Sequence, residues 1–130
     1  MNFIKKGIFI ILCFAVTSCN SDDDANLVSQ EVFFRVDNKS SYLLEEVLID
    51  NTEFIDVPPQ TVSSYKVFAN AGPPKNFPPS YFTISTSDEN IKTSIVYDYA
   101  SGASIESGFY TLTVDVDTNN RININYFKDE

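Results

Sequence analysis

Apolar and polar residues alternate along most of the chain between residues 31 and 130. A period of two is typical of β-strands that bury one face. Residues 43–48 are also compatible with a helix, but their β-branched neighbours favour a strand. The pattern therefore predicts an all-β domain. The expected strands are centred on residues 32–36, 47–49, 55–57, 65–67, 82–84, 91–97, 110–116 and 122–126.

The last two runs give the clearest pairing signal. Residues 110, 112, 114 and 116 are apolar, as are residues 122, 124 and 126. Thr118-Asn119-Asn120 separates the two runs and is typical of a tight turn. We therefore expect a C-terminal β-hairpin.

Seven or eight short strands within about 100 residues are typical of a single antiparallel β-sandwich, immunoglobulin-like or similar. All six prolines fall in three pairs, at residues 58–59, 73–74 and 78–79. Each pair lacks two backbone donors, so we expect it in a loop or at a sheet edge. The folded domain is expected to span residues 31–130.

One short motif supports this fold. Glu106-Ser107-Gly108-Phe109-Tyr110 resembles the tyrosine corner of immunoglobulin-like domains, with Glu106 in place of the usual Asp. The resemblance implies that the Tyr110 hydroxyl bonds back to the backbone where the chain passes between sheets. The cysteine pair and the tryptophan of true immunoglobulin domains are absent from the sequence, so the motif supports the fold and not the family.

Residues 1–18 predict a cleaved signal peptide. Lys5 and Lys6 precede an apolar stretch of about ten residues, half of what a membrane-spanning helix needs. Val16-Thr17-Ser18-Cys19 resembles the lipobox of bacterial lipoproteins. The resemblance implies cleavage between Ser18 and Cys19 and a lipid on the Cys19 sulfur, which would hold the protein on a membrane. The alternative is an ordinary signal peptide with a chance cysteine.

Residues 19–30 are expected to form the lipidated cysteine and a flexible acidic tether. Ser21, Asp22, Asp23 and Asp24 follow Cys19 almost directly. This run resembles the export signal of surface lipoproteins in Bacteroidota-type bacteria. The resemblance implies an outer-membrane protein that faces the cell exterior. The alternative is a solvated tether on a protein that faces the periplasm.

Charge and composition exclude several functions. The chain has 18 acidic residues, 9 basic residues and no His. The leader carries Lys5 and Lys6 but no acid, so its removal changes the net charge from −9 to −11. Such a surface repels nucleic-acid phosphates, so we expect no nucleic-acid partner. The lack of His excludes Ser-His and Cys-His nucleophiles. We expect no enzyme and no cofactor; a small hydrolase with paired carboxylates is the less favoured alternative.

Aromatic residues are the main candidates for ligand binding. Phe77 and Tyr81 precede the strand at residues 82–84, and Tyr97 and Tyr99 lie at the end of the strand at residues 91–97. Exposed aromatic side chains bind sugars and proteins, because they present a large apolar area at small entropic cost. The alternative is that these residues fill one end of the core.

A short acidic motif near the C-terminus is a weak metal candidate. Asp115, Asp117 and Asn119 match the opening of a calcium loop. The match fails at Asn120, where the loop needs Gly, and at Tyr126, where it needs a bidentate Glu. We favour a hairpin turn stabilised by these side chains, so no metal is expected.

These features predict a lipid-anchored, non-catalytic binding or accessory module for a glycan or a protein. An envelope structural or assembly protein is the alternative.

Overall fold

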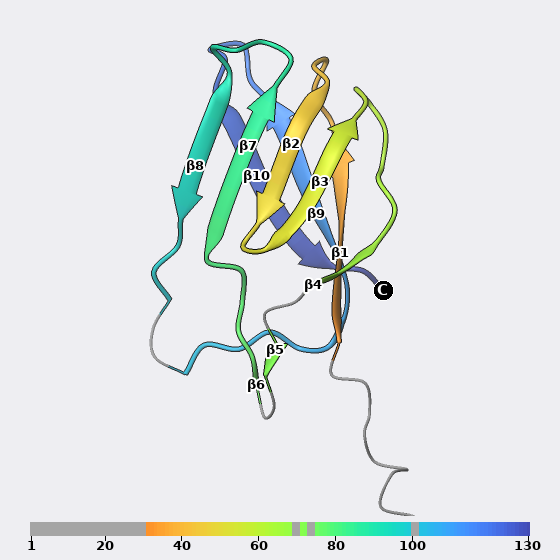
Figure 1. The fold of residues 1–130 in the computed structure, drawn as a ribbon, viewed down its shortest axis with the longest axis vertical. Coiled ribbons are helices and arrows are strands. Elements are labelled where there is room, and N and C mark those ends of the chain that lie inside the picture. Colours follow the sequence, from red (N-terminus) through yellow and green to blue (C-terminus); the bar gives the residue numbers. More distant parts are fainter. Residues whose placement is uncertain (1–30, 69–70, 73–74, 100–101) are drawn as a thin grey trace, which may run out of the picture.

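The structure, a computed structural model, describes residues 31–68, 71–72, 75–99 and 102–130. Two four-stranded sheets face each other, so the predicted β-sandwich is confirmed (Figure 1). One sheet has the strand order β10-β9-β1-β4 and the other β3-β2-β7-β8. The described strands are β1 (Val32–Asn38), β2 (Leu44–Ile49), β3 (Thr52–Val57), β4 (Lys66–Phe68), β5 (Ala71–Gly72), β6 (Lys75–Asn76), β7 (Tyr81–Thr86), β8 (Lys92–Val96), β9 (Gly108–Val116) and β10 (Ile122–Lys128).

The β10-β9-β1-β4 sheet is mixed, which corrects the prediction of a purely antiparallel sandwich. β1 and β9 run parallel, from Val32 opposite Gly108 to Asn38 opposite Val114. The other pairs in the two sheets are antiparallel, including the predicted β9-β10 hairpin. A parallel pair needs a long connection, and the chain between β1 and β9 supplies it. Hydrophobic periodicity carries no information about strand direction.

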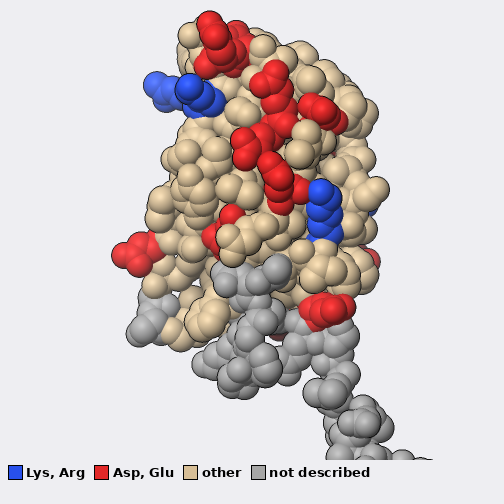
Figure 2. Space-filling model, viewed as in Figure 1, with Lys and Arg blue, Asp and Glu red and all other residues tan. Residues whose placement is uncertain are grey.

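Charged side chains are distributed unequally between the two sheets. The strands of the β3-β2-β7-β8 sheet contain one basic residue, Lys92, and several acidic ones. Figure 2 shows Asp and Glu side chains gathered over this face. The acidic residues in these strands are Glu45, Glu46, Glu53 and Asp56. The opposite sheet carries Arg35, Lys66 and Lys128 in its strands and is the less acidic of the two.

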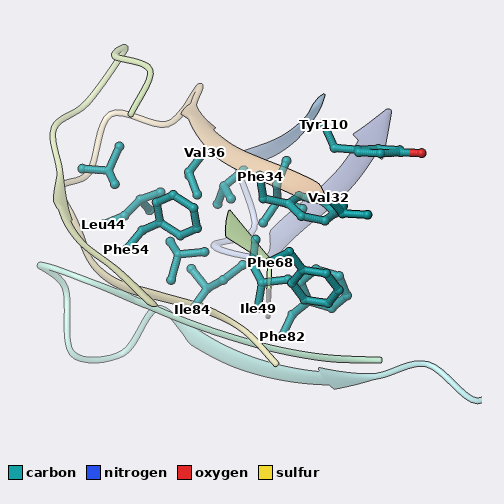
Figure 3. Close-up of a cluster of buried hydrophobic side chains, with 14 of the residues drawn as sticks. Val32, Phe34, Val36, Leu44, Ile49, Phe54, Phe68, Phe82, Ile84 and Tyr110 are labelled. Carbon is teal, nitrogen blue, oxygen red and sulfur yellow. The ribbon is translucent and has the colours of Figure 1, made fainter. Parts of the chain in front are cut away.

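A single core fills the space between the sheets (Figure 3). Phe34 on β1 is fully buried near the middle of this core. Its ring centroid lies 5.3 Å from that of Phe68, 5.4 Å from that of Tyr110 and 5.8 Å from that of Tyr126. These aromatic contacts join β1 to its neighbours β4 and β9 and to β10 beyond β9, and the predicted inward faces of β1 and β9 are confirmed.

In two of the predicted strands, the residues that face the core are not the ones that the alternation predicts. On β3, Phe54 is buried and Ile55 is 59% exposed, because Asp56 adopts a positive φ of 52° and shifts the alternation before Val57. On β4, Phe68 is buried and Val67 is 50% exposed. Local periodicity in such short strands does not determine which face packs on the core.

The tyrosine corner is confirmed. The Tyr110 hydroxyl donates a hydrogen bond of 3.0 Å to the backbone carbonyl of Glu106. Gly108, between them, has a φ of 135°, and a Cβ there would lie 2.9 Å from Cε of Lys128. The Lys128 Nζ in turn lies 2.8 Å from a carboxylate oxygen of Glu106. This turn fixes the start of β9 against the end of β10.

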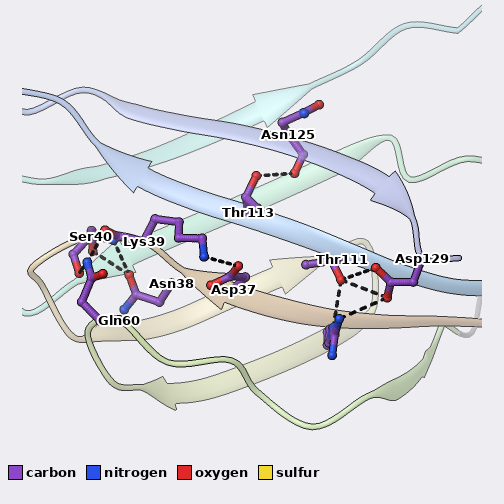
Figure 4. Close-up of polar contacts among 10 residues, drawn as sticks. Asp37, Asn38, Lys39, Ser40, Gln60, Thr111, Thr113, Asn125 and Asp129 are labelled. Carbon is purple, nitrogen blue, oxygen red and sulfur yellow. Dashed lines mark hydrogen bonds and ion pairs between the residues drawn. The ribbon is translucent and has the colours of Figure 1, made fainter.

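Asn38 is a buried polar centre at the end of β1. Its Nδ2 lies within donating distance of the carbonyls of Tyr42 (2.8 Å), Val57 (3.0 Å) and Pro58 (3.1 Å). Its Oδ1 accepts hydrogen bonds from the backbone N and the hydroxyl of Ser40 (Figure 4). The side chain thereby ties β1 of one sheet to the ends of β2 and β3 of the other.

Candidate functional site

The outer face of the β10-β9-β1-β4 sheet carries a band of apolar side chains. Phe109 is 47% exposed, Phe127 48% and Val67 50%. The strand register places Val67 and Phe109 on either side of Phe33, and Phe127 lies diagonally across the β9-β10 pair from Phe109. Tyr65, just before β4, also contacts Phe109. We call these five residues the aromatic stripe, and it crosses all four strands of the sheet.

Ring contacts join three members of the stripe, Phe33, Tyr65 and Phe109. The Phe33 and Phe109 rings are stacked, with centroids 4.8 Å apart and planes 15° apart. The Tyr65 ring meets Phe109 edge to face at 4.9 Å, and the Arg35 guanidinium carbon lies 4.7 Å from the Tyr65 centroid. Each of these contacts contributes about 1 kcal/mol. Together they fix the Phe33, Tyr65 and Phe109 rings relative to one another.

A polar network borders the stripe and positions Tyr65. The Arg35 Nε donates to Oγ1 of Thr111 at 2.9 Å, and that hydroxyl donates to the Asp129 carboxylate at 2.7 Å (Figure 4). The Tyr65 hydroxyl donates to the same carboxylate, and the Arg35 guanidinium lies 3.6 Å from it. Asp129 thus anchors side chains from three different segments of the chain.

The network shifts two pKa values in opposite directions. Partial burial of Asp129 acts to raise its pKa, but the hydrogen bonds from Tyr65 and Thr111 and the charge of Arg35 outweigh it, so the pKa lies below its ordinary value of 3.8. The pKa of Tyr65 lies above 10.0, mainly because its hydroxyl is bonded to Asp129. Both shifts keep Tyr65 neutral and Asp129 charged near neutral pH.

The Asp129 shift predicts how stability depends on pH. A carboxylate whose folded pKa is depressed stabilises the fold above its unfolded pKa, and this contribution is lost as the pH falls through the folded pKa. We expect urea unfolding midpoints of the wild type to fall below about pH 4, and Asp129→Asn to flatten part of that fall while lowering stability at pH 7. Asp98→Asn at an exposed position is the control. An Asp129→Asn profile parallel to that of the wild type would contradict the role of the network.

The sequence-predicted aromatic candidates do not form one surface. Tyr97 and Tyr99 do meet, with centroids 6.0 Å apart, and Tyr97 packs edge to face on buried Phe82 at 5.7 Å. The Tyr99 hydroxyl lies 3.3 Å from that of Tyr126, and burial together with this bond raises the pKa of Tyr99. Tyr99 is partly buried by these contacts, whereas Tyr97 is still 40% exposed, so the two tyrosines border the core and Tyr97 keeps an open surface.

Phe77 and Tyr81 do not stack on that pair. Tyr81 lies opposite Val96, the residue before Tyr97, but in the described residues no ring contact links Tyr81 or Phe77 to Tyr97 or Tyr99. Phe77 is 54% exposed. Tyr81 points outward from β7, where hydrogen bonding to Thr83 lowers the pKa of its hydroxyl.

The stripe was not predicted, because Phe33, Phe109 and Phe127 occupy outward positions that strand periodicity assigns to polar residues. Tyr65 and Val67 were expected to face the core, but Val67 is 50% exposed. Aromatic residues at outward positions of neighbouring strands were the signal available in the sequence.

The acidic motif at the β9-β10 turn accepts hydrogen bonds from the backbone of the turn itself. An Asp117 carboxylate oxygen accepts hydrogen bonds from the backbone N–H groups of Asn119 (2.8 Å) and Arg121 (3.0 Å), and these bonds lower the pKa of Asp117. Asp115 is exposed and bonds to the next backbone N–H. Asn120 has the positive φ that the turn requires. Within the described residues, no group of three or more acidic, His or Cys side chains is arranged to hold a metal.

The residues that carry the lipoprotein resemblance lie outside the described part of the chain. They include Ser18 and Cys19 of the cleavage site, and Ser21, Asp22, Asp23 and Asp24 of the acidic run. Among the described residues, none belongs to a helix long and apolar enough to cross a bilayer.

Comparison with known proteins assigns no family. No protein-family model matches the sequence, and no curated protein matches it. The function is therefore argued from the chemistry of the chain.

Proposed function

We propose that the protein is a lipid-anchored, surface-facing module of the outer membrane that has no catalytic activity and binds another protein through the aromatic stripe. The observation that carries this proposal is the concentration of Phe109, Phe127 and Val67, each about half exposed, on one face of one sheet. Isolated exposed apolar residues are common, but contiguous ones on a small domain mark interaction surfaces.

The composition of the stripe favours a protein over a glycan. Aromatic and Arg side chains are enriched at protein interfaces and supply most of their binding energy. A sugar would instead need a free ring face and unsatisfied polar groups beside it. Here Phe33 and Phe109 cover one face of each other, and Arg35, Thr111 and Asp129 are bonded among themselves. A rigid patch with a satisfied polar rim suits an apolar protein surface.

The leader and the tether support the proposed location. A lipid on Cys19 would leave residues 20–30 as the link to the domain, with a reach of at most about 40 Å. Phe33 is the second residue of β1 and Phe109 the second of β9, so the stripe lies at the end of the sandwich where the chain enters. The proposed partner is therefore a protein on or near the same membrane. Scaffolding within the envelope is the alternative use of the same surface.

A crosslinking experiment on intact cells tests the stripe. A photoreactive amino acid at position 127 is expected to give one discrete adduct with another protein, and Phe109→Ser to reduce its yield at least tenfold, because central aromatic residues contribute about 2 kcal/mol or more to binding. Retained unfolding midpoints would show that the fold is intact.

The opposite sheet provides matched controls. Val96 and Ile55 are 73% and 59% exposed, so a probe at position 96 and the variant Ile55→Ser test apolar side chains that are at least as exposed as those of the stripe. Equal adducts from positions 96 and 127, or a scatter of unrelated neighbours, would contradict the proposal. Retention on a polysaccharide column that Phe109→Ser abolishes would replace the protein partner by a glycan.

A further inference from the structure

β10 forms an edge of its sheet and pairs only with β9 within the described residues. The Asp117 N–H donates to the Arg121 carbonyl at one end of this pair, and the Asp129 N–H donates to the Phe109 carbonyl at the other. The odd-numbered residues of β10 therefore direct their backbone groups toward β9. In an antiparallel ladder the even-numbered ones then direct theirs away from it.

The outward groups form a continuous row on β10. They belong to the four even-numbered residues Ile122, Ile124, Tyr126 and Lys128. Unpaired rows of this kind are templates for pairing with another strand. β10 has seven residues with no Pro, Gly or register shift along its pairing with β9.

The other edge strands are shorter or interrupted. β4 has three residues and β8 has five, beginning at Lys92. β3 contains Asp56 with its positive φ and is followed by Pro58-Pro59, which has no donors. Short length, charged residues, backbone irregularities and Pro are common features that prevent an edge strand from pairing with another chain. β10 is thus the longest and least protected edge.

The core is also least covered at this edge. Its partly buried members are Ile95 on β8 and Ile122, Ile124 and Tyr126 on β10. The β10 members are the same residues whose backbone groups point outward. A strand added here would satisfy these groups, and apolar residues at alternate positions on it would cover the core. β10 itself has this alternation, so it is complementary to a second copy of itself.

We propose that a second copy of this chain pairs on this edge, β10 against β10 and antiparallel, with Asn125 opposite Asn125. This register keeps the apolar residues of both strands on the core side, because even-numbered residues then face even-numbered ones. It also sets no like charges opposite each other, because Arg121 faces Asp129 and Lys128 faces Ile122 of the second copy. The result is one continuous eight-stranded sheet with both aromatic stripes on the same face. This proposal does not rest on lipid attachment or on the protein partner.

Cysteine crosslinking tests the register in cells that make the full chain. Asn125→Cys places two thiols in a pair without hydrogen bonds, where Cα atoms are about 4.5 Å apart, and a disulfide can form. Asn123→Cys is the matched control, since its two copies would be separated by about 13 Å. On mild oxidation we expect a disulfide-linked dimer from Asn125→Cys at least fivefold more abundant than from Asn123→Cys, and none from the wild type.

A second variant links the dimer to backbone pairing. The Ile124 N–H points away from β9, so Ile124→Pro would remove an outward donor and keep the β9 ladder, whereas Ile124→Val would keep both. In the Asn125→Cys background, we expect Ile124→Pro to reduce the yield of disulfide-linked dimer at least fivefold. We expect Ile124→Val to leave that yield unchanged. Equal crosslinking of positions 123 and 125, no dimer from position 125, or an adduct there with a different protein would each overturn the proposal.

Discussion

Replacing Asn38 by Leu is expected to lower the free energy of unfolding by about 3 kcal/mol or more. The substitution removes the donor that serves the carbonyls of Tyr42, Val57 and Pro58. It also removes the acceptor for Ser40, which is itself buried. Each buried polar group left without a partner costs about 1–3 kcal/mol, and Leu supplies no replacement.

The effect of Asn38→Leu should extend to both sheets, because the side chain joins the end of β1 to the ends of β2 and β3. Urea unfolding followed by tyrosine fluorescence and by far-ultraviolet circular dichroism should show one shifted transition in both signals. Asn123→Leu, at an exposed position on β10, is the control and should change stability by less than about 0.5 kcal/mol. A shift for Asn38→Leu no larger than that of the control would show that the buried bonds contribute nothing net.

The sequence predicts much of the fold because the longer strands obey a simple rule. The alternation around Phe34 and Leu112 identifies inward faces that are fully buried in the structure. The Asn-rich turn between β9 and β10 and the Tyr110 corner are local motifs, and both form as expected. In these elements local preference and tertiary packing agree.

The predictions fail where the backbone conformation of a single residue, or pairing with a strand distant in the sequence, determines the structure. The positive φ of Asp56 turns Ile55 outward and Phe54 inward, and no periodicity reveals it. The parallel β1-β9 pair depends on the path of the whole intervening chain.

The candidate site was the least predictable part. Phe33 and Phe109 are outward by their alternation, but only the register shows that they are neighbours and stack. Tyr97 and Tyr99 lie close together, as their aromatic density predicts, and Tyr97 both packs on Phe82 and is 40% exposed. Residue type alone does not separate an aromatic side chain that binds from one that fills a core end.

Replacing Cys19 by Ala is expected to release the protein from the membrane. Two or more acyl chains on the Cys19 sulfur and the new amino terminus would anchor the domain stably, since each buried CH₂ contributes about 0.8 kcal/mol. Without them, a domain with a net charge of −11 after removal of the leader has no electrostatic attraction to anionic headgroups. Fractionation should therefore move the Cys19→Ala protein whose leader has been cleaved from the membrane to the soluble fraction. A variant whose leader is cleaved and that still stays in the membrane fraction would contradict lipid attachment.

The most direct test of the proposed surface location is digestion of intact cells with proteinase K. A variant in which Asp22, Asp23 and Asp24 are all replaced by Ala is digested in parallel. Cleavage in the tether should remove the wild-type domain from the cells, and a periplasmic marker should stay intact. The triple variant should remain on the membrane but be protected, because it would be retained on the inner leaflet. If the wild type is protected on intact cells and degraded only after the outer membrane is opened, the protein faces the periplasm and the proposed surface function is wrong.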